Sequence, residues 1–194
     1  LLCAGGTGGH LFPAEALAHE LNRRGREVHL VTDERAGRYA GSFPAAQIHV
    51  VPSATFASRK PLAVLRAGLT LWRGYREAIA LMRRLEPAVV VGFGGYPTVP
   101  PMMAAVQTGR PTVVHEQNAV MGRANRFLGP RVRAVAAGIP QVEAAPVVAS
   151  KTTVTGNPVR PPVLEAASLP YAASRGEAMC ARLLAAYLGW RFVD

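Results

Sequence analysis

The residue types best suited to binding an anion form the run GGTGGH at residues 5–10, between a short apolar segment and a predicted helix. Glycines leave backbone N–H groups open to a ligand, and the N-terminus of the following helix favours negative charge. The run therefore predicts a site for a phosphate or a sugar pyrophosphate, whereas the alternative is a tight turn that needs glycine for steric reasons. His10 is a candidate general base, and the alternative is that it hydrogen-bonds only the loop backbone.

Three further loops rich in glycine or polar residues follow predicted strands, at 92–97, 115–118 and 156–160. Because ligands of parallel sheets bind at the carboxyl ends of the strands, we expect all four loops to converge on one rim. Gly94 and Gly95 repeat the bare backbone of the first loop, and Tyr96 can stack on a ligand or donate a hydrogen bond. Arg160 can hold a phosphate through two N–H groups, although surface arginines are common in this chain.

The third loop contains carboxylate and amide side chains. Glu116 is a second candidate base, but we favour the interpretation that it accepts hydrogen bonds from backbone N–H groups. Asn118 in the same loop, and Asn125 farther along, offer paired donors and acceptors that suit sugar hydroxyls. The alternative role of both asparagines is to stabilise a turn.

Short apolar runs alternate along the chain with apolar positions spaced by three or four, which predicts alternating strands and helices. Strands are predicted at 1–4, 28–31, 48–51, 88–91, 112–114, 134–137 and 147–148. Helices are predicted from Pro13 to Gly25, over 61–84 and over 99–107. This order predicts an α/β fold with a Rossmann-like parallel sheet and helices on both faces. We expect one domain over 1–160, a linker over 161–174, and an atypical tail over 175–194 that completes no second domain.

The formal net charge is +10, and half of that excess lies in residues 51–100. Within this region the long predicted helix carries an apolar stripe flanked by basic residues, which include Leu65, Leu69, Trp72, Arg66 and Arg73. The stripe predicts packing in the core, and the alternative is contact with an anionic bilayer surface. Charge alone would also suit nucleic acid, but the sequence contains no recognisable nucleic-acid motif, so no nucleic-acid partner is expected.

Several other kinds of site are excluded. Cys3 and Cys180 show neither a disulfide framework nor the spacing of a metal site. The first loop is not a dinucleotide fingerprint, because Leu11 stands where the third glycine should be, and no Gly-Lys-Ser/Thr of a P-loop follows. No apolar run approaches the roughly 18 residues that a membrane-spanning helix needs, so any membrane contact is expected at the surface.

Four strings in this order resemble the MurG family of bacterial glycosyltransferases: GGTGGHLFPAEALAHEL at 5–21, GFGGYPTVP at 92–100, HEQNAVMGRANR at 115–126 and GNPVR at 156–160. The resemblance covers residues 1 to about 170. It implies a GT-B fold of two Rossmann-like domains, of which this chain is the N-terminal, acceptor-side half. It also implies an inverting transfer of N-acetylglucosamine from UDP-N-acetylglucosamine to lipid I, giving lipid II for peptidoglycan, with no bound metal and no cofactor.

The resemblance implies roles for residues that match the family's strings. The pyrophosphate-facing loop corresponds to Thr7, Gly8 and Gly9, and the donor contacts correspond to Asn118 and Arg160. His10 corresponds to the favoured base, with Glu116 as the less favoured choice. The acceptor cleft corresponds to Gly94, Gly95, Tyr96, Glu116 and Asn125.

The implied partners are the UDP-sugar, the acceptor undecaprenyl-pyrophosphoryl-MurNAc-pentapeptide, and anionic lipids of the inner leaflet, which the basic helix after Pro61 would contact. The implied location is peripheral, on the cytoplasmic face of the bacterial inner membrane.

One departure from the family concerns the second domain, which opens with a Gly-Gly-Ser-Gln-Gly-Ala loop and binds most of the UDP-sugar. That loop is not found in residues 1–194, and we expect the chain to begin inside a domain, to fold, and to be inactive alone. The alternatives are a stand-alone binding module for lipid-linked or nucleotide sugars and a non-functional truncated product.

Overall fold

The described part of the chain forms one parallel sheet. The computed structural model describes residues 1–5, 8–37, 42–54, 60–140, 142, 144–161 and 163. Seven strands lie in the order β3-β2-β1-β4-β5-β6-β7, and every neighbouring pair is parallel. The strands are β1 (Leu2–Cys3), β2 (His29–Thr32), β3 (Gln47–Val50), β4 (Val90–Gly92), β5 (Thr112–Glu116), β6 (Ala134–Ala137) and β7 (Thr152–Val154). The predicted Rossmann-like parallel sheet is confirmed.

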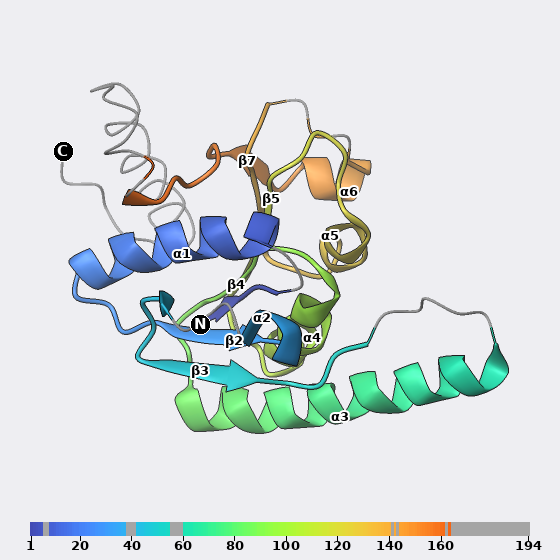
Figure 1. Ribbon diagram of the computed structural model, residues 1–194. Helices are drawn as coiled ribbons and strands as arrows, with labels where there is room; N and C mark the ends of the chain where they lie inside the picture. Colours follow the sequence, from blue (N-terminus) through green and yellow to red (C-terminus); the bar gives the residue numbers. More distant parts are fainter. Residues whose placement is uncertain are drawn as a thin grey trace.

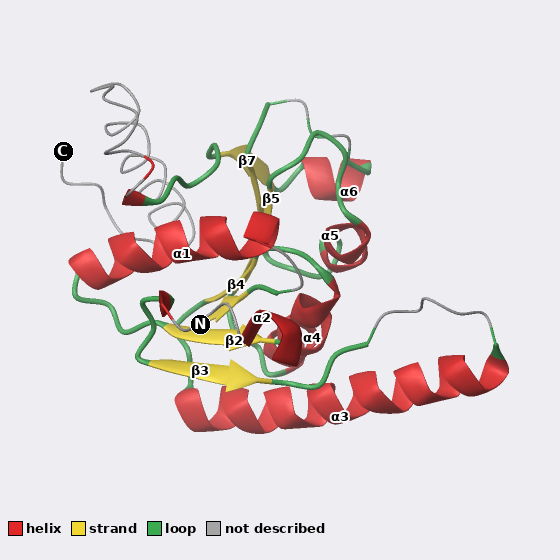
Figure 2. Ribbon diagram, in the orientation of Figure 1, coloured by secondary structure: helices red, strands yellow, loops and turns green. Residues whose placement is uncertain are grey.

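Helices cover both faces of this sheet, as the sequence predicts (Figures 1 and 2). Helix α1 (Gly8–Arg23) packs on one face. The other face is covered by α3 (Pro61–Leu85), α4 (Val99–Gln107), α5 (Arg123–Leu128) and α6 (Pro146–Ala149). Two shorter elements, α2 (Glu34–Gly37) and the 3₁₀ helix η2 (Tyr96–Thr98), follow β2 and β4.

The central strands are apolar on both sides because both faces are covered. On β5, for example, Val113 belongs to the core beneath α1, whereas Val114 belongs to the core beneath α3, α4 and α5. The same alternation places Leu30 on the first side and Val31 on the second. One core therefore packs on each face of the central strands.

Two predicted element boundaries are wrong. Helix α1 begins at Gly8, and Pro13 lies inside it. Pro13 cannot donate to the carbonyl of Gly9, and the cost is reduced because Gly9 is exposed to water. Residues 147–148 belong to α6 rather than to a strand, because Pro146 has the fixed φ of a first helical residue. The seventh strand is instead Thr152–Val154, whose β-branched residues suit an edge strand.

Helix α3 divides into a buried and an exposed half. Toward its C-terminal end, Ala78, Leu81 and Met82 pack in the core. Toward its N-terminal end, four large apolar side chains are 52% to 60% exposed; they are Leu62, Leu65, Leu69 and Trp72. The prediction that this stripe packs in the core is therefore wrong for the first half of the helix. The 25 residues of α3 carry it past α4 and beyond the edge of the sheet (Figure 1).

Gly74 marks the boundary between the two halves of α3. A Cβ atom at this position would overlap the carbonyl oxygen of Pro52, so the helix can approach the preceding loop only because this residue has no side chain. Among the residues that the structure describes, no helix is both long and apolar enough to cross a membrane. The predicted linker and tail, 161–194, lie outside the described residues except for Pro161 and Val163.

Candidate functional site

A cavity of about 360 Å³ lies at the carboxyl ends of β1, β4 and β5. This is the position where the strand order reverses, between β1 and β4, and where sheets of this kind bind ligands. The lining includes the predicted site residues His10, Gly94, Gly95, Tyr96, Glu116, Asn118 and Asn125. It also includes Gly5, Arg35, Pro97, Gly122, Arg123 and Ala124. The fold thus brings three of the four predicted loops to one cavity.

His10 is the third residue of α1, and its imidazole packs against the glycines that follow β4. A Cβ on Gly94 would lie 3.2 Å from Nδ1 of His10, and a Cβ on Gly95 would lie 2.9 Å from the carbonyl oxygen of Gly5. Both glycines have positive φ angles, +93° and +81°, which side chains disfavour. Nδ1 of His10 is buried and has no hydrogen-bond partner in the described part of the chain. This geometry favours a ligand contact over a bond to the loop backbone.

Glu116 is 1% exposed and holds the loop that follows β5. Its Oε1 accepts hydrogen bonds from the backbone N and the Nδ2 of Asn118, both at 3.0 Å. Its Oε2 accepts from the backbone N of Gly122 at 2.9 Å and from Nδ2 of Asn125 at 3.0 Å. Four donors therefore stabilise this carboxylate, which supports the interpretation of Glu116 as an acceptor that shapes the loop.

The two asparagines differ in exposure. Asn118 is exposed at the cavity. Asn125 is 2% exposed, and its Nδ2 also donates to the carbonyl oxygen of His115 at 3.0 Å. Oδ1 of Asn125 is buried and has no hydrogen-bond partner among the described residues. A buried polar atom without a partner is costly, so this oxygen is available for a donor on a ligand.

His115 and its hydrogen-bond partner Gln117 connect the segments that follow β4, β5 and β7. The sequence patterns do not indicate this role. Nε2 of His115 donates to the carbonyl oxygen of Gly156 at 3.0 Å, and its Nδ1 accepts from Nε2 of Gln117 at 3.1 Å. The same amide nitrogen of Gln117 donates to the carbonyl oxygen of Phe93 at 3.1 Å. Burial lowers the pKa of His115, which agrees with a neutral ring that has one donor and one acceptor.

Three further predicted residues, Gly8, Gly9 and Arg160, are not part of the described cavity lining. The guanidinium of Arg160 lies 3.8 Å from the ring centre of Phe12 and 3.5 Å from Oε2 of Glu15, on the outer side of α1. Gly8 and Gly9 form the first turn of α1, where backbone N–H groups lack partners within the helix. Thr7 lies outside the described residues.

Two arginines of the lining were not among the predicted site residues. Arg35 comes from α2, directly after β2, and Arg123 is the first residue of α5. The rule that strand ends carry sites would have found Arg35. Arg123 stands inside the string at 115–126, but nothing in the string shows which of its residues face the cavity.

The parallel sheet, its strand order and the cavity at the reversal point define the N-terminal half of a GT-B glycosyltransferase. Residues 1–137 match the glycosyltransferase family 28 N-terminal domain, and the chain belongs to this family. Among solved structures, the chain is similar to MurG of Acinetobacter baumannii, with a TM-score of 0.64 and 30% sequence identity over 74% of this chain and 42% of that one.

Two curated relatives have the name UDP-N-acetylglucosamine–N-acetylmuramyl-(pentapeptide) pyrophosphoryl-undecaprenol N-acetylglucosamine transferase. The protein of Chelativorans sp. (strain BNC1) is 63% identical, over 91% of this chain and 47% of the relative. The protein of Allorhizobium ampelinum (strain S4) is 66% identical, over 88% of this chain and 45% of the relative. The chain therefore spans about half the length of the curated relatives it matches.

Proposed function

We propose that the chain supplies the acceptor-binding half of an inverting glycosyltransferase. The reaction moves N-acetylglucosamine from UDP-N-acetylglucosamine to lipid I and gives lipid II for peptidoglycan synthesis. The observation that carries this proposal is the pair of buried, unpartnered atoms at the cavity, Nδ1 of His10 and Oδ1 of Asn125. A sugar hydroxyl can donate to either atom. The names of the relatives supply the identity of the two substrates.

In the proposed reaction, His10 takes the proton of the acceptor's 4-hydroxyl as that oxygen attacks the anomeric carbon of the donor sugar. The new C–O bond forms on one face of the sugar while the bond to the UDP oxygen breaks on the other, which inverts the configuration. Open N–H groups at Gly8, Gly9, Gly94 and Gly95 stabilise pyrophosphate charge. Glu116 and Asn125 act as positioning residues, because their bonds fix the loop beside the base.

The donor belongs mainly to a second half in this proposal, and residues 1–194 by themselves bind acceptor without transferring sugar. The lengths of the relatives support this division, because the matched part is less than half of each. The proposed contacts with the donor are Asn118, exposed at the cavity rim, and Arg160, which packs against Phe12 of α1.

Calorimetric titration of this chain tests the proposal, with an acceptor analogue that keeps the pyrophosphate, the muramyl sugar and the pentapeptide on a short prenyl chain. We expect saturable binding of the analogue, much weaker binding of UDP-N-acetylglucosamine, and no turnover with both present. Binding that remains unchanged in Asn125→Leu would contradict the assignment of this cavity. Failure of the purified chain to fold would favour a non-functional product.

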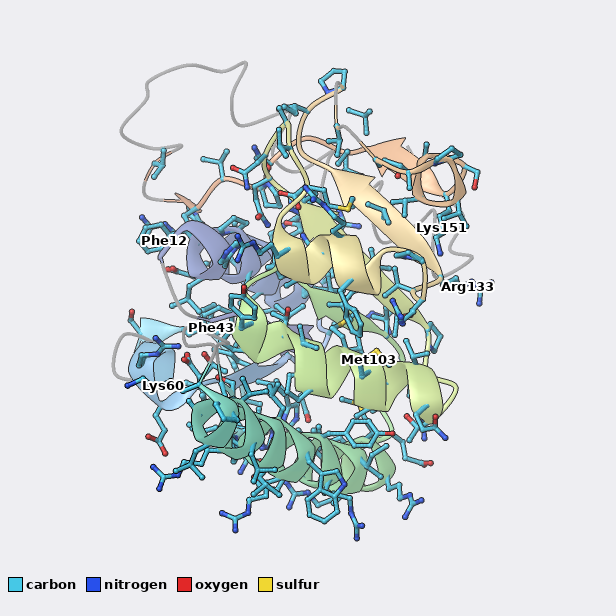
Figure 3. All side chains as sticks on the ribbon, turned by 90° about the vertical axis from the view of Figure 1, so that its right-hand side faces the viewer. Phe12, Phe43, Lys60, Met103, Arg133 and Lys151 are labelled. Atoms are coloured by element: carbon cyan, nitrogen blue, oxygen red, sulfur yellow. The ribbon has the colours of Figure 1, made fainter. Side chains whose placement is uncertain are left out.

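The exposed half of α3 is the proposed contact with the membrane. Lys60 directly precedes the helix (Figure 3), and the exposed Arg66 and Arg73 follow among its apolar side chains. The guanidinium of Arg76 lies 5.3 Å from the ring centre of Trp72. An amphipathic helix of this composition suits the headgroup region of an anionic bilayer. We therefore propose peripheral attachment to the cytoplasmic face of the inner membrane, with anionic lipids as partners.

A further inference from the structure

We infer that Arg35 and Arg123 form an oxyanion-binding pair at the cavity, which takes a phosphate or a carboxylate group of the acceptor. The inference rests on the proposed function, because the acceptor carries both kinds of group. It adds two residues that the sequence patterns did not indicate and that come from elements on different sides of the strand-order reversal, α2 and α5.

Arg35 is held by one edge of its guanidinium. Its Nε donates to Oδ2 of Asp33 at 3.1 Å, and Asp33 is itself buried. The Arg35 side chain is 62% exposed. A guanidinium has five N–H donors, so a bond from Nε leaves the two terminal nitrogens for another acceptor. Asp33 thus orients Arg35 without occupying the end that an oxyanion would contact.

Arg123 is exposed at the start of α5 and lines the same cavity. Across the described ranges it forms neither an ion pair nor a hydrogen bond. The neighbouring Arg126, in contrast, donates to the carbonyl oxygen of Met121 and is occupied by the protein itself. Arg123 therefore presents a complete guanidinium to the cavity.

In the described lining no carboxylate pairs with Arg123, and Arg35 forms its ion pair through Nε alone, with Asp33 outside the lining. Glu116 is the acidic residue of the described lining, and its two oxygens already accept four hydrogen bonds within the loop. The lining also includes the backbone of Gly94 and Gly95, whose N–H groups have no protein acceptor among the described residues. A cleft with this surplus of unused N–H donors suits an anion, and guanidinium groups bind phosphate and carboxylate oxygens in pairs.

The test measures binding of the acceptor analogue by this chain and by Arg35→Gln, Arg123→Gln and the double variant. Arg133→Gln is the matched control, because Arg133 is an exposed arginine outside the cavity lining (Figure 3). We expect each single substitution to raise the Kd about tenfold and the double substitution to raise it further. The control should stay within twofold. Thermal unfolding should be unchanged in Arg123→Gln and Arg133→Gln, whose substituted side chains are exposed, and slightly lower in Arg35→Gln, which loses the bond to the buried Asp33.

A second analogue with amidated peptide carboxylates distinguishes the two sources of the oxyanion. If the pair binds phosphate, the variants lose the same factor with both analogues. If the pair binds a carboxylate, amidation weakens binding by the unsubstituted chain. The variants and the unsubstituted chain then have the same Kd for the amidated analogue. Variants that bind the intact analogue within twofold of the unsubstituted chain would overturn the inference while the proposed function stands. No binding by the unsubstituted chain would overturn the proposed function and, with it, this inference.

Discussion

The cavity rim and the exposed half of α3 are built on opposite principles. The rim consists of glycine backbone and a few buried polar side chains. Hydrogen bonds hold these side chains to the end of β5 and to the loop that follows it. The exposed half of α3 uses large apolar and basic side chains that contact little of the protein. The first arrangement suits a ligand of one shape, and the second suits a surface without a fixed shape. Single substitutions should therefore damage the rim much more than the helix.

The largest effect is expected at His10. Replacing the matching histidine by alanine in a full-length relative should lower kcat by about 10² to 10⁴, because a general base contributes roughly that factor. Acceptor affinity should fall by a much smaller factor, about tenfold, because the variant also loses one hydrogen bond from the acceptor sugar to His10. A kcat within threefold of the unsubstituted enzyme would remove His10 from the role of base.

The next largest effect is expected in the stability of the rim. Glu116→Gln replaces a carboxylate that accepts four hydrogen bonds with an amide that has one acceptor and one donor group. The free energy of unfolding in urea should fall by about 2–4 kcal/mol. Arg66→Gln, in the exposed half of α3, is the control and should change it by less than about 0.5 kcal/mol. Equal losses of unfolding free energy in the two variants would contradict the proposed difference between the cavity rim and the exposed half of α3.

A smaller effect is expected for the helix, and in a different measurement. Trp72→Ser should weaken partitioning onto anionic vesicles about tenfold, because a large aromatic side chain leaves the interface. Unfolding should be unaffected, since Trp72 is 57% exposed. Val147→Ser is the control, because Val147 is 56% exposed but lies on α6. If the fraction of protein that floats with the vesicles does not depend on their content of anionic lipid, the membrane assignment is contradicted.

The smallest effect is expected from pH. The pKa of His115 is lowered by burial, so the unfolded chain binds more protons than the folded one below the ordinary pKa of about 6.5. Stability is then fully present above that pH and falls as the pH drops, by at most about 1.4 kcal/mol per pH unit. His49, whose pKa is also lowered, should first be replaced by glutamine so that its own contribution to the pH dependence is removed. Equal unfolding free energies at pH 7.5 and 5.5 in His49→Gln would contradict a buried neutral His115.

The sheet could be predicted closely, because strands buried on both sides leave continuous apolar runs such as the one before Gly92. The start of α1 was misplaced because a proline is tolerated where the carbonyl it fails to satisfy faces water. Residues 147–148 were misassigned because two apolar residues are too few to show a period. The length of α3 was apparent, but its exposed half was not, since a sequence does not show where the sheet beneath a helix ends.

The site could be predicted in outline for a similar reason. Strand-end loops are recognisable in the sequence by their glycine and polar residues, and these indicate His10, Gly94 and Asn125 as candidates. The bonds that determine their roles join distant segments, such as His115 to Gly156, and no local pattern records them. Arg35 could have been found because it closely follows a strand end, whereas for Arg123 only the cavity shows which residue of the string at 115–126 lines it.

The central claim is that the acceptor binds at the rim and not along α3, and nuclear magnetic resonance tests it most directly. The labelled chain is titrated with the acceptor analogue while the ring signals of His10 and the indole signal of Trp72 are followed. We predict saturable shifts of the His10 and Asn125 side-chain signals and no change in the indole signal of Trp72. Shifts at Trp72 with unmoved His10 signals would contradict it.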